Sequence, residues 1–185
     1  MTIIIKGERI NLRILKKSDA NAIYEGVSNP EVSRYIPLIP KPYKLEDANW
    51  FISHTKKSYR KKSSYELAIE LKKEKKIVGM IGLTNLNQES KRAEIGYWLN
   101  QNYWRQGIIS EALELLVDYG FTQLELEKIT AKVLHENEGS AKLLTKHGFT
   151  LEGRLRRETY TNDQWYDDLV YSILKEEYQT LKRKE

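Results

Sequence analysis

The feature of this sequence with the clearest chemical meaning is residues 100–110, which contain no acidic side chain and one glycine, Gly107. A strand-like segment precedes this stretch, and an amphipathic helical segment follows it. The first N–H groups of a helix have no intrahelical acceptor and carry a partial positive charge, which suits a phosphate. The stretch therefore favours a phosphate-binding turn, although an ordinary turn would also use a glycine. The predicted apolar face of the helix is Ile109, Ala112, Leu113 and Leu116.

The sequence lacks the motifs and residues that several nucleotide, cysteine and metal sites require. It has no G-x-x-x-x-G-K-[ST] motif for nucleoside triphosphates and no G-x-G-x-x-G motif for dinucleotides. Without cysteine, it cannot form a disulfide, a thiolate nucleophile or a cysteine-type zinc site, and its three histidines lack metal-ligand spacing. We therefore expect no bound metal.

Length and composition indicate an ordinary globular protein. The chain of 185 residues is predicted to be one domain, residues 1–185. No apolar run approaches the roughly 20 residues of a membrane span, and the N-terminal apolar segment is too short for a signal peptide, so we expect a cytoplasmic protein.

The net charge of +5 comes from basic clusters. Solvated helix ends and turns explain such clusters, while attraction of an anionic cofactor or an RNA-bound partner stays open. Aromatic side chains are not interleaved with them, so no direct nucleic-acid function is expected. The clusters lie in residues 56–62, 72–76, 154–157 and 182–184.

Hydrophobic patterns predict a mixed α/β fold, with helices on the faces of a mixed sheet. On the second predicted helix, we expect Trp50, Phe51 and His54 on the inner side. Strands are predicted at residues 10–14, 65–71, 76–84, 92–99, 128–134, 149–158 and 165–174, and helices at 18–27, 45–59, from the turn to about 120, and at 139–147.

The motifs, taken together, identify a family. The chain resembles the GNAT superfamily of acetyl-coenzyme-A-dependent N-acetyltransferases, and within it the ribosomal-protein alanine/serine N-acetyltransferase (RimJ/RimL-type) branch. This resemblance implies one GNAT-type domain with a mostly antiparallel sheet of six to seven strands and about four helices. The matching motifs are Glu8-Arg9-Ile10-Asn11-Leu12-Arg13, Ser18-Asp19-Ala20, Glu94-Ile95-Gly96-Tyr97-Trp98-Leu99, Tyr103-Trp104-Arg105-Gln106-Gly107, Ser110-Glu111-Ala112, Asn137-Glu138-Gly139-Ser140 and Gly148-Phe149 with Glu152-Gly153.

The resemblance also implies where acetyl-coenzyme A binds. Backbone N–H groups between Arg105 and Ser110 would hold the pyrophosphate, and the pantetheine would lie along the strand end at Trp98 and Leu99, like an added strand. A backbone N–H near Leu99 would face the thioester carbonyl. Asn137 is either a contact to the pantetheine, the cap of the next helix, or both. The implied cofactor residues are Trp98, Leu99, Trp104, Arg105, Gln106, Gly107, Ile108, Ile109, Ser110 and Asn137; Trp104 matches the branch, while Ile109 replaces a residue that is usually small.

Direct attack of an amine on the thioester needs a proton acceptor and a proton donor. The resemblance makes Ser140 the candidate acid for the departing thiolate, with capping of a helix as its alternative role. Glu94 and Glu158 are the candidate bases. Relatives in the branch carry an acid one position after Glu158, where this chain has Thr159. Tyr97, Tyr160 and Trp165 are expected to shape the acceptor cleft or the core, and Asp167 to make a structural or a catalytic contact.

The resemblance implies an amine acceptor, and the pKa of the amine helps to choose between a lysine side chain and an α-amine. A lysine amine with a pKa near 10.4 costs roughly 4 kcal/mol to deprotonate at pH 7.4, whereas an α-amine near 7.7–8.0 costs less than about 1. We therefore expect the α-amine of a protein, ribosomal or other, as the acceptor. The loop at residues 33–43 and the following helix are the expected specificity elements. A homodimer is possible in this branch.

Two other functions stay open. The first is acetylation of a small amine, such as a polyamine, an aminoglycoside or an amino acid; an acidic cluster along the cleft would favour a polyamine. Asp167 and Asp168 are the only obvious acidic pair near the expected cleft. The second is an acyl-coenzyme-A sensor that binds without turnover.

Overall fold

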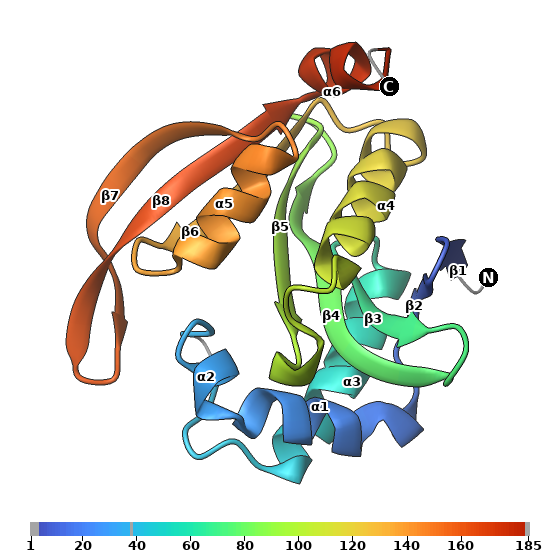
Figure 1. The fold of residues 1–185 in the computed structure, drawn as a ribbon, viewed down its shortest axis with the longest axis vertical. Helices are drawn as coiled ribbons and strands as arrows, with labels where there is room; N and C mark the ends of the chain where they lie inside the picture. Colours follow the sequence, from blue (N-terminus) through green and yellow to red (C-terminus); the bar gives the residue numbers. More distant parts are fainter. Residues whose placement is uncertain (1–3, 38, 184–185) are drawn as a thin grey trace.

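The computed structural model describes residues 4–37 and 39–183. Its core is one eight-stranded sheet in the order β1-β2-β3-β4-β5-β6-β8-β7, in which β5 and β6 are parallel and all other neighbours are antiparallel (Figure 1). The predicted mixed, mostly antiparallel sheet is confirmed, with one strand more than expected. The strands are β1 (Ile4–Lys6), β2 (Ile10–Ile14), β3 (Tyr65–Leu71), β4 (Lys76–Asn87), β5 (Arg92–Leu99), β6 (Lys128–Leu134), β7 (Thr150–Thr161) and β8 (Gln164–Leu174).

Helices cover both faces of the sheet. One hydrophobic core joins α4 and α5 to the face that carries Leu67, Ile81 and Ile129. A second, smaller core joins α1 and α3 to the opposite face, which carries Ala68 and Met80. The helices are α1 (Ala20–Ser28), α2 (Pro30–Ser33), α3 (Leu45–Arg60), α4 (Ile108–Thr122), α5 (Glu138–Lys146) and α6 (Lys175–Lys182), with 3-10 turns at Lys17–Asp19 and Gln101–Tyr103.

Three short elements, β1, α2 and α6, were not predicted, because local pattern is weakest in short elements. Strand β1 has three residues and exposes Ile4. Helix α2 has four residues, and a proline in so short a segment suggests a loop. In the structure, Pro30 is the first residue of the helix. The Asn29 side chain caps the helix by accepting from the Glu31 N–H at 2.9 Å.

The predicted inner side of α3 is wrong for two aromatic residues. Trp50 is 65% exposed and stacks on exposed His54, with ring centroids 4.9 Å apart. Ala48, Ile52 and Thr55 face the sheet instead, because this narrow stripe repeats at the helical spacing. Trp50 therefore belongs to the outer surface of the helix.

A similar shift affects the start of α4. The sequence predicts Ile109 as the first position of the apolar face, but Ile108 is buried and Ile109 is half-buried. The helix begins at Ile108, directly after Gly107, so its first turn points Ile108 to the core. The other predicted members of the face, Ala112, Leu113 and Leu116, are buried as expected.

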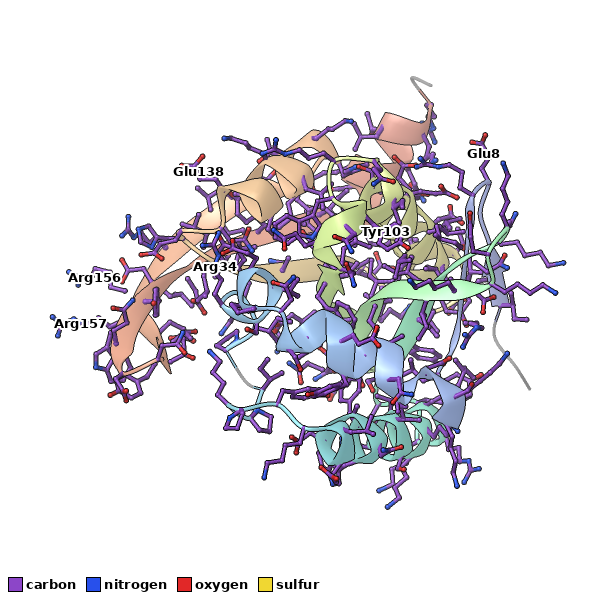
Figure 2. All side chains as sticks on the ribbon, turned by 60° about the horizontal axis from the view of Figure 1, so that its bottom comes forward. Glu8, Arg34, Tyr103, Glu138, Arg156 and Arg157 are labelled. Atoms are coloured by element: carbon purple, nitrogen blue, oxygen red, sulfur yellow. The ribbon has the colours of Figure 1, made fainter. Side chains whose placement is uncertain are left out.

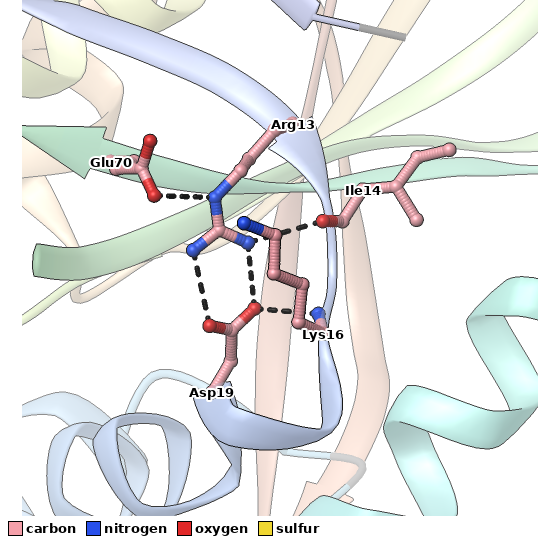
Figure 3. A network of polar contacts seen from close by, with 5 residues as sticks. All are labelled: Arg13, Ile14, Lys16, Asp19 and Glu70. Atoms are coloured by element: carbon pink, nitrogen blue, oxygen red, sulfur yellow. Dashed lines mark hydrogen bonds and ion pairs between the residues drawn. The ribbon is translucent and has the colours of Figure 1, made fainter. Parts of the chain in front are cut away.

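A buried ion-pair network fixes α1 to the sheet (Figure 3). Arg13 on β2 donates two hydrogen bonds to Asp19 at 2.8 and 3.1 Å and a third, from Nε, to Glu70 on β3 at 2.5 Å. Asp19 also accepts the Lys16 N–H at 2.7 Å. The network thus holds the start of α1 against two strands. At the other end of α1, the Trp98 ring fills the space beside Gly26, where a Cβ would lie 2.4 Å from it.

Strands β5 and β6 separate along their length. Their parallel pairing covers three rungs only, Arg92–Lys128, Ala93–Ile129 and Glu94–Thr130. Beyond Glu94, β5 keeps its pairing with β4 on one side up to Leu99. Its other edge faces the region where β6 has diverged. On the far side of the sheet, β7 and β8 form a long twisted hairpin (Figure 1).

Candidate active site

The predicted phosphate turn lies at the N-terminus of α4. Gly107 is the N-cap residue and has a left-handed backbone with φ +74°, a conformation that favours glycine. Arg105 is also left-handed, at φ +58°. The helix opens with Ile108, Ile109 and Ser110, whose N–H groups are the first of the helix and have no intrahelical partner. The turn therefore leaves these N–H groups available to an anion, and phosphate binding at this turn stays a prediction.

The structure adds a side chain to this turn that was not predicted as part of the site. Arg9 reaches it from the start of β2 and donates from Nη1 to the Gln106 carbonyl at 2.8 Å, and its Nη2 lies 3.2 Å from where a Gly107 Cβ would stand. Arg9 also pairs through Nε with Glu111 at 3.0 Å. The only signal in the sequence is that Arg9 and Glu111 both lie in family motifs.

The contact with Arg9 stabilises the ionised form of Glu111. Burial alone would raise its pKa, but hydrogen bonds from the backbone and side chain of Arg9 and from the backbone of Ile10 outweigh burial and lower it. The carboxylate is therefore engaged by Arg9 and by the Ile10 N–H. The half-exposed guanidinium of Arg9 leaves a positive charge beside the turn.

The open edge of β5 comes next to the turn. Asn100 donates its N–H to Val78 on β4, and the Ala93 carbonyl accepts from Thr130 on β6. Because successive residues of a strand point their backbone groups to opposite sides, Tyr97 and Leu99 face the side from which β6 has diverged. The Leu99 carbonyl accepts the Trp104 indole N–H at 2.8 Å, so the turn is tied to the strand end. Trp98 faces β4 with its backbone.

Helix α5 borders the same gap. The Asn137 side chain caps the helix by accepting the Ser140 N–H at 3.2 Å. The Ser140 hydroxyl lies 2.8 Å from the Tyr97 hydroxyl, so a bond crosses from α5 to β5. Burial raises the pKa of Tyr97 to about 12, which keeps its phenol protonated at neutral pH. The structure therefore brings the predicted acid, Ser140, to the edge of the strand predicted to hold the cofactor.

The candidate bases lie on the sheet face opposite α4 and α5. We call this the acceptor face, and define it by Glu94 on β5, Lys132 on β6, Glu158 on β7 and Asp168 on β8. Lys132 pairs with Glu158 at 2.9 Å. That hydrogen bond raises the pKa of Lys132, and the charges of Glu94 and Asp168 act in the same direction. The two candidate bases and Asp168 therefore surround one lysine.

Other predicted residues of the hairpin have structural contacts. Asp167 accepts the Arg157 N–H at 2.8 Å and the Arg154 Nε at 2.6 Å, and these bonds lower its pKa. This arrangement fits the structural role among the two that the sequence left open. Tyr160 and Trp165 are each 56% exposed and pack on each other across the hairpin, so neither lies in the core.

The loop between α2 and α3 approaches the same hairpin. Lys41 donates to the Asn162 side chain at 2.7 Å and lies 3.4 Å from the Thr161 hydroxyl. The loop predicted to set specificity therefore contacts the tip of the hairpin; Leu38 within it lies outside the described residues. Among residues 4–37 and 39–183, no group of three or more His, Cys, Asp or Glu side chains could hold a metal ion, and none of their helices could span a membrane.

Comparison with known proteins decides the family. Residues 9–150 match a family model described as an acetyltransferase (GNAT) domain. The chain belongs to the GNAT family of acetyltransferases. It is 40% identical to the uncharacterized N-acetyltransferase YoaA of Bacillus subtilis (strain 168), over 93% of this chain and 97% of that protein. A crystal structure described as a probable acetyltransferase matches with a TM-score of 0.86 and 29% identity, over 95% of this chain and 98% of that one.

Relatives with named acceptors fall into two classes. The ribosomal-protein-serine acetyltransferase of Escherichia coli (strain K12) is 37% identical over 54% of this chain and 56% of its own length. The spermidine N(1)-acetyltransferase of the same strain is 29% identical over 91% of this chain and 88% of its own length. The resemblance to the GNAT superfamily and its RimJ/RimL-type branch is confirmed, and the protein is an N-acetyltransferase that uses acetyl-coenzyme A.

The residues present fit this cosubstrate. The left-handed Gly107 leaves the helix N-terminus open to the pyrophosphate, and Arg9 adds a positive charge. The open edge of β5 offers backbone groups to an extended pantetheine. Acetyl-coenzyme A, when bound, supplies the activated acetyl thioester. The roles of the individual site residues stay predictions, and the Tyr97–Ser140 pair is the one most directly open to test.

If the Ser140 hydroxyl protonates the departing thiolate, Ser140→Ala is expected to lower kcat on the order of 10²-fold without changing coenzyme A affinity. Tyr97→Phe removes the group that orients this hydroxyl and is expected to lower kcat about 10-fold. The double variant should be no slower than Ser140→Ala, because the two hydroxyls act as one unit. Steady-state kinetics and calorimetry provide both readouts.

Tyr24→Phe, on the exposed side of α1, is the matched control for the tyrosine change. It should leave kcat unchanged. Full activity of Ser140→Ala would remove Ser140 from the reaction, and a double variant slower by the product of the two single effects would show that Tyr97 acts independently of Ser140.

Proposed function

We propose that this N-acetyltransferase acts on the α-amine at the N-terminus of a protein, ribosomal or other. The observation that carries this proposal is the charge balance of the acceptor face. Three carboxylates on this face and at its margin are paired with cations, Glu158 with Lys132, Glu152 with Lys128 and Asp167 with Arg154, which leaves only Glu94 and Asp168 among the acids named here without an ion pair. A polycation would need unpaired carboxylates along its length, whereas a single amine does not.

The acceptor face also has room above its backbone. A Cβ atom added at Gly96 on β5 or at Gly153 on β7 would meet no described atom within 4 Å. Both glycines lie on the acceptor face, since Gly96 alternates with core-facing Ile95 and Gly153 pairs with Val170, whose neighbour Tyr171 faces the core. This uncovered surface supports an acceptor that enters as an extended chain end. Figure 2 shows Arg156 and Arg157 projecting from the hairpin, where an acceptor protein could contact them.

The proposed reaction assigns one task to each part of the site. The turn from Arg105 to Ser110 holds the pyrophosphate through backbone N–H groups. The Leu99 N–H faces the gap and stabilises the oxyanion formed on attack. Ser140 donates the proton that the departing sulfur receives. Glu94 or Glu158 lies on the acceptor face to draw the proton that the amine nitrogen loses as its bond to the acetyl group forms, directly or through water.

A small amine is the second candidate acceptor. The observation that favours it is the kinship with the spermidine N(1)-acetyltransferase. Glu94 has no lysine or arginine bonded to it among the described residues; its carboxylate accepts only from the Asn85 amide, at 3.4 Å. That free charge could hold one further ammonium group.

Acetyl-coenzyme A should release thiol when it is mixed with the protein and peptides that begin with a free Ser or Ala. The same peptides with blocked N-termini, and spermidine, are the comparisons. Release with the free peptides alone supports α-amine acetylation. Release with spermidine alone contradicts it and favours the small-amine function, and coenzyme A binding without release from any amine favours a sensor.

A further inference from the structure

Asp168 on β8 is a buried carboxylate with an incomplete set of partners. The residue is 5% exposed. Its Oδ2 accepts the Thr159 hydroxyl at 2.9 Å, while its buried Oδ1 has no hydrogen-bond partner in the described part of the chain. Buried carboxylates are normally paired, because an unsatisfied charged oxygen costs free energy. Asp168 therefore needs an explanation that packing does not supply.

Its place in the fold is at the centre of the acceptor face. Asp168 lies directly across from Leu134 on β6 and from Leu155 on β7. The Leu134 carbonyl accepts the Asn137 N–H at 2.7 Å, which links this rung of the sheet to the cap of the helix carrying Ser140. Thr159 is half-buried and Asp168 is 5% exposed, so the Thr159 hydroxyl is the more accessible member of this hydrogen-bonded pair.

The surroundings of Asp168 favour its protonated form. Burial raises its pKa, and the nearby carboxylates Glu158 and Asp167 act in the same direction, against the Thr159 hydrogen bond and the charge of Lys132. Lys132 donates to Glu158 and not to Asp168, and Glu94 lies on the far side of Lys132, on β5. Asp167 has its own partners, Arg154 and the Arg157 N–H.

We propose that Thr159 contacts the acceptor ammonium and relays its proton to Asp168 before the amine attacks the thioester. The ammonium N–H bond breaks as the Thr159 oxygen takes that proton, and the Thr159 O–H bond breaks as Asp168 Oδ2 takes the other. The charge balances, because an ammonium and a carboxylate become a neutral amine and a carboxylic acid. Asp168 is then a positioning residue behind Thr159. This step rests on the proposed function in that it requires an amine acceptor, but not on which amine it is.

The effect of Asp168 on stability distinguishes the proposed role from a purely structural role. A carboxyl whose pKa is raised in the folded protein binds more protons when folded than when unfolded. Stability is then lost as pH rises from the ordinary carboxyl value of about 4 through the raised value. Asp168→Asn removes this penalty, so the variant should have an equal or higher melting temperature at pH 7.5 while its activity falls. A structural residue would show the opposite change in melting temperature.

The experiment compares Thr159→Val, Thr159→Ser and Asp168→Asn, using whichever amine the wild-type protein acetylates, peptide or spermidine. Thr159→Val should lower kcat/KM on the order of 10²-fold, and Thr159→Ser, which keeps the hydroxyl, should restore it to within a few-fold. Asp168→Asn should lose activity to a similar extent and flatten the acidic limb of the pH profile. Coenzyme A affinity should not change.

Thr150→Val on the same strand and Asp163→Asn at the hairpin turn are exposed matched controls that should keep wild-type kinetics. Wild-type activity of Thr159→Val, or a pH profile unchanged in Asp168→Asn, would overturn the relay. Even if Asp168→Asn fails to fold, the Val and Ser variants of Thr159 decide the outcome. If the wild-type protein acetylates spermidine but not the peptides, only the α-amine proposal is contradicted. If it acetylates neither amine, both the α-amine proposal and the relay are overturned.

Discussion

Gly107→Glu is expected to weaken binding of coenzyme A by about 10³-fold or more. A residue with a Cβ costs about 1–2 kcal/mol in the left-handed conformation that Gly107 adopts, at φ +74°. The new carboxylate would also repel the pyrophosphate and displace at least one N–H bond to it, worth roughly 1.5–3 kcal/mol. Together these two losses amount to about 2.5–5 kcal/mol, and the charge repulsion adds to them, so we expect about three decades in the dissociation constant.

Calorimetric titration with coenzyme A measures this effect, and Gly107→Ala separates its two causes. The alanine variant carries the backbone strain and a Cβ near Arg9 Nη2, but no charge, so it should weaken binding only about 10-fold. Equal affinity in the wild-type protein and the glutamate variant would show that the pyrophosphate binds elsewhere. A thermal melt checks that both variants are folded.

Arg13→Ala is expected to lower the free energy of unfolding by about 3–5 kcal/mol. The Arg13 side chain is only 8% exposed, and its loss would leave Asp19, a carboxylate that is 5% exposed, without its two charged hydrogen bonds. Glu70 would lose its 2.5 Å contact as well. Removing one partner of a buried pair is costly because the remaining charge stays out of water.

Urea unfolding measures this loss, with Arg34→Ala as the control. Arg34 pairs with Glu31 at 3.1 Å, but both side chains are about half exposed, so this change should cost less than about 1 kcal/mol. An Arg13→Ala variant as stable as the control would mean that the protein relaxes around the buried acids. Helix α1 should also loosen, with faster amide exchange at Ala20–Ser28.

The sequence determined the features that depend on neighbours in the chain. The spacing of apolar residues defined β3 and β5 to the residue and placed β6, because strand periodicity needs only local alternation. The glycine after a stretch without acids predicted the turn at Gly107, because a left-handed N-cap and open helix N–H groups are local properties. Order and spacing of motifs identified the family.

Only the tertiary structure decided which distant side chains meet. Arg9 reaches Gln106 across 97 positions, and Tyr97 reaches Ser140 across 43. Thr159 meets Asp168 because the hairpin register, with its shift between Leu155 and Thr159, brings them onto one face. These contacts depend on strand order and register, which hydrophobic periodicity does not encode, since it reports the face of each residue but not its cross-strand partner.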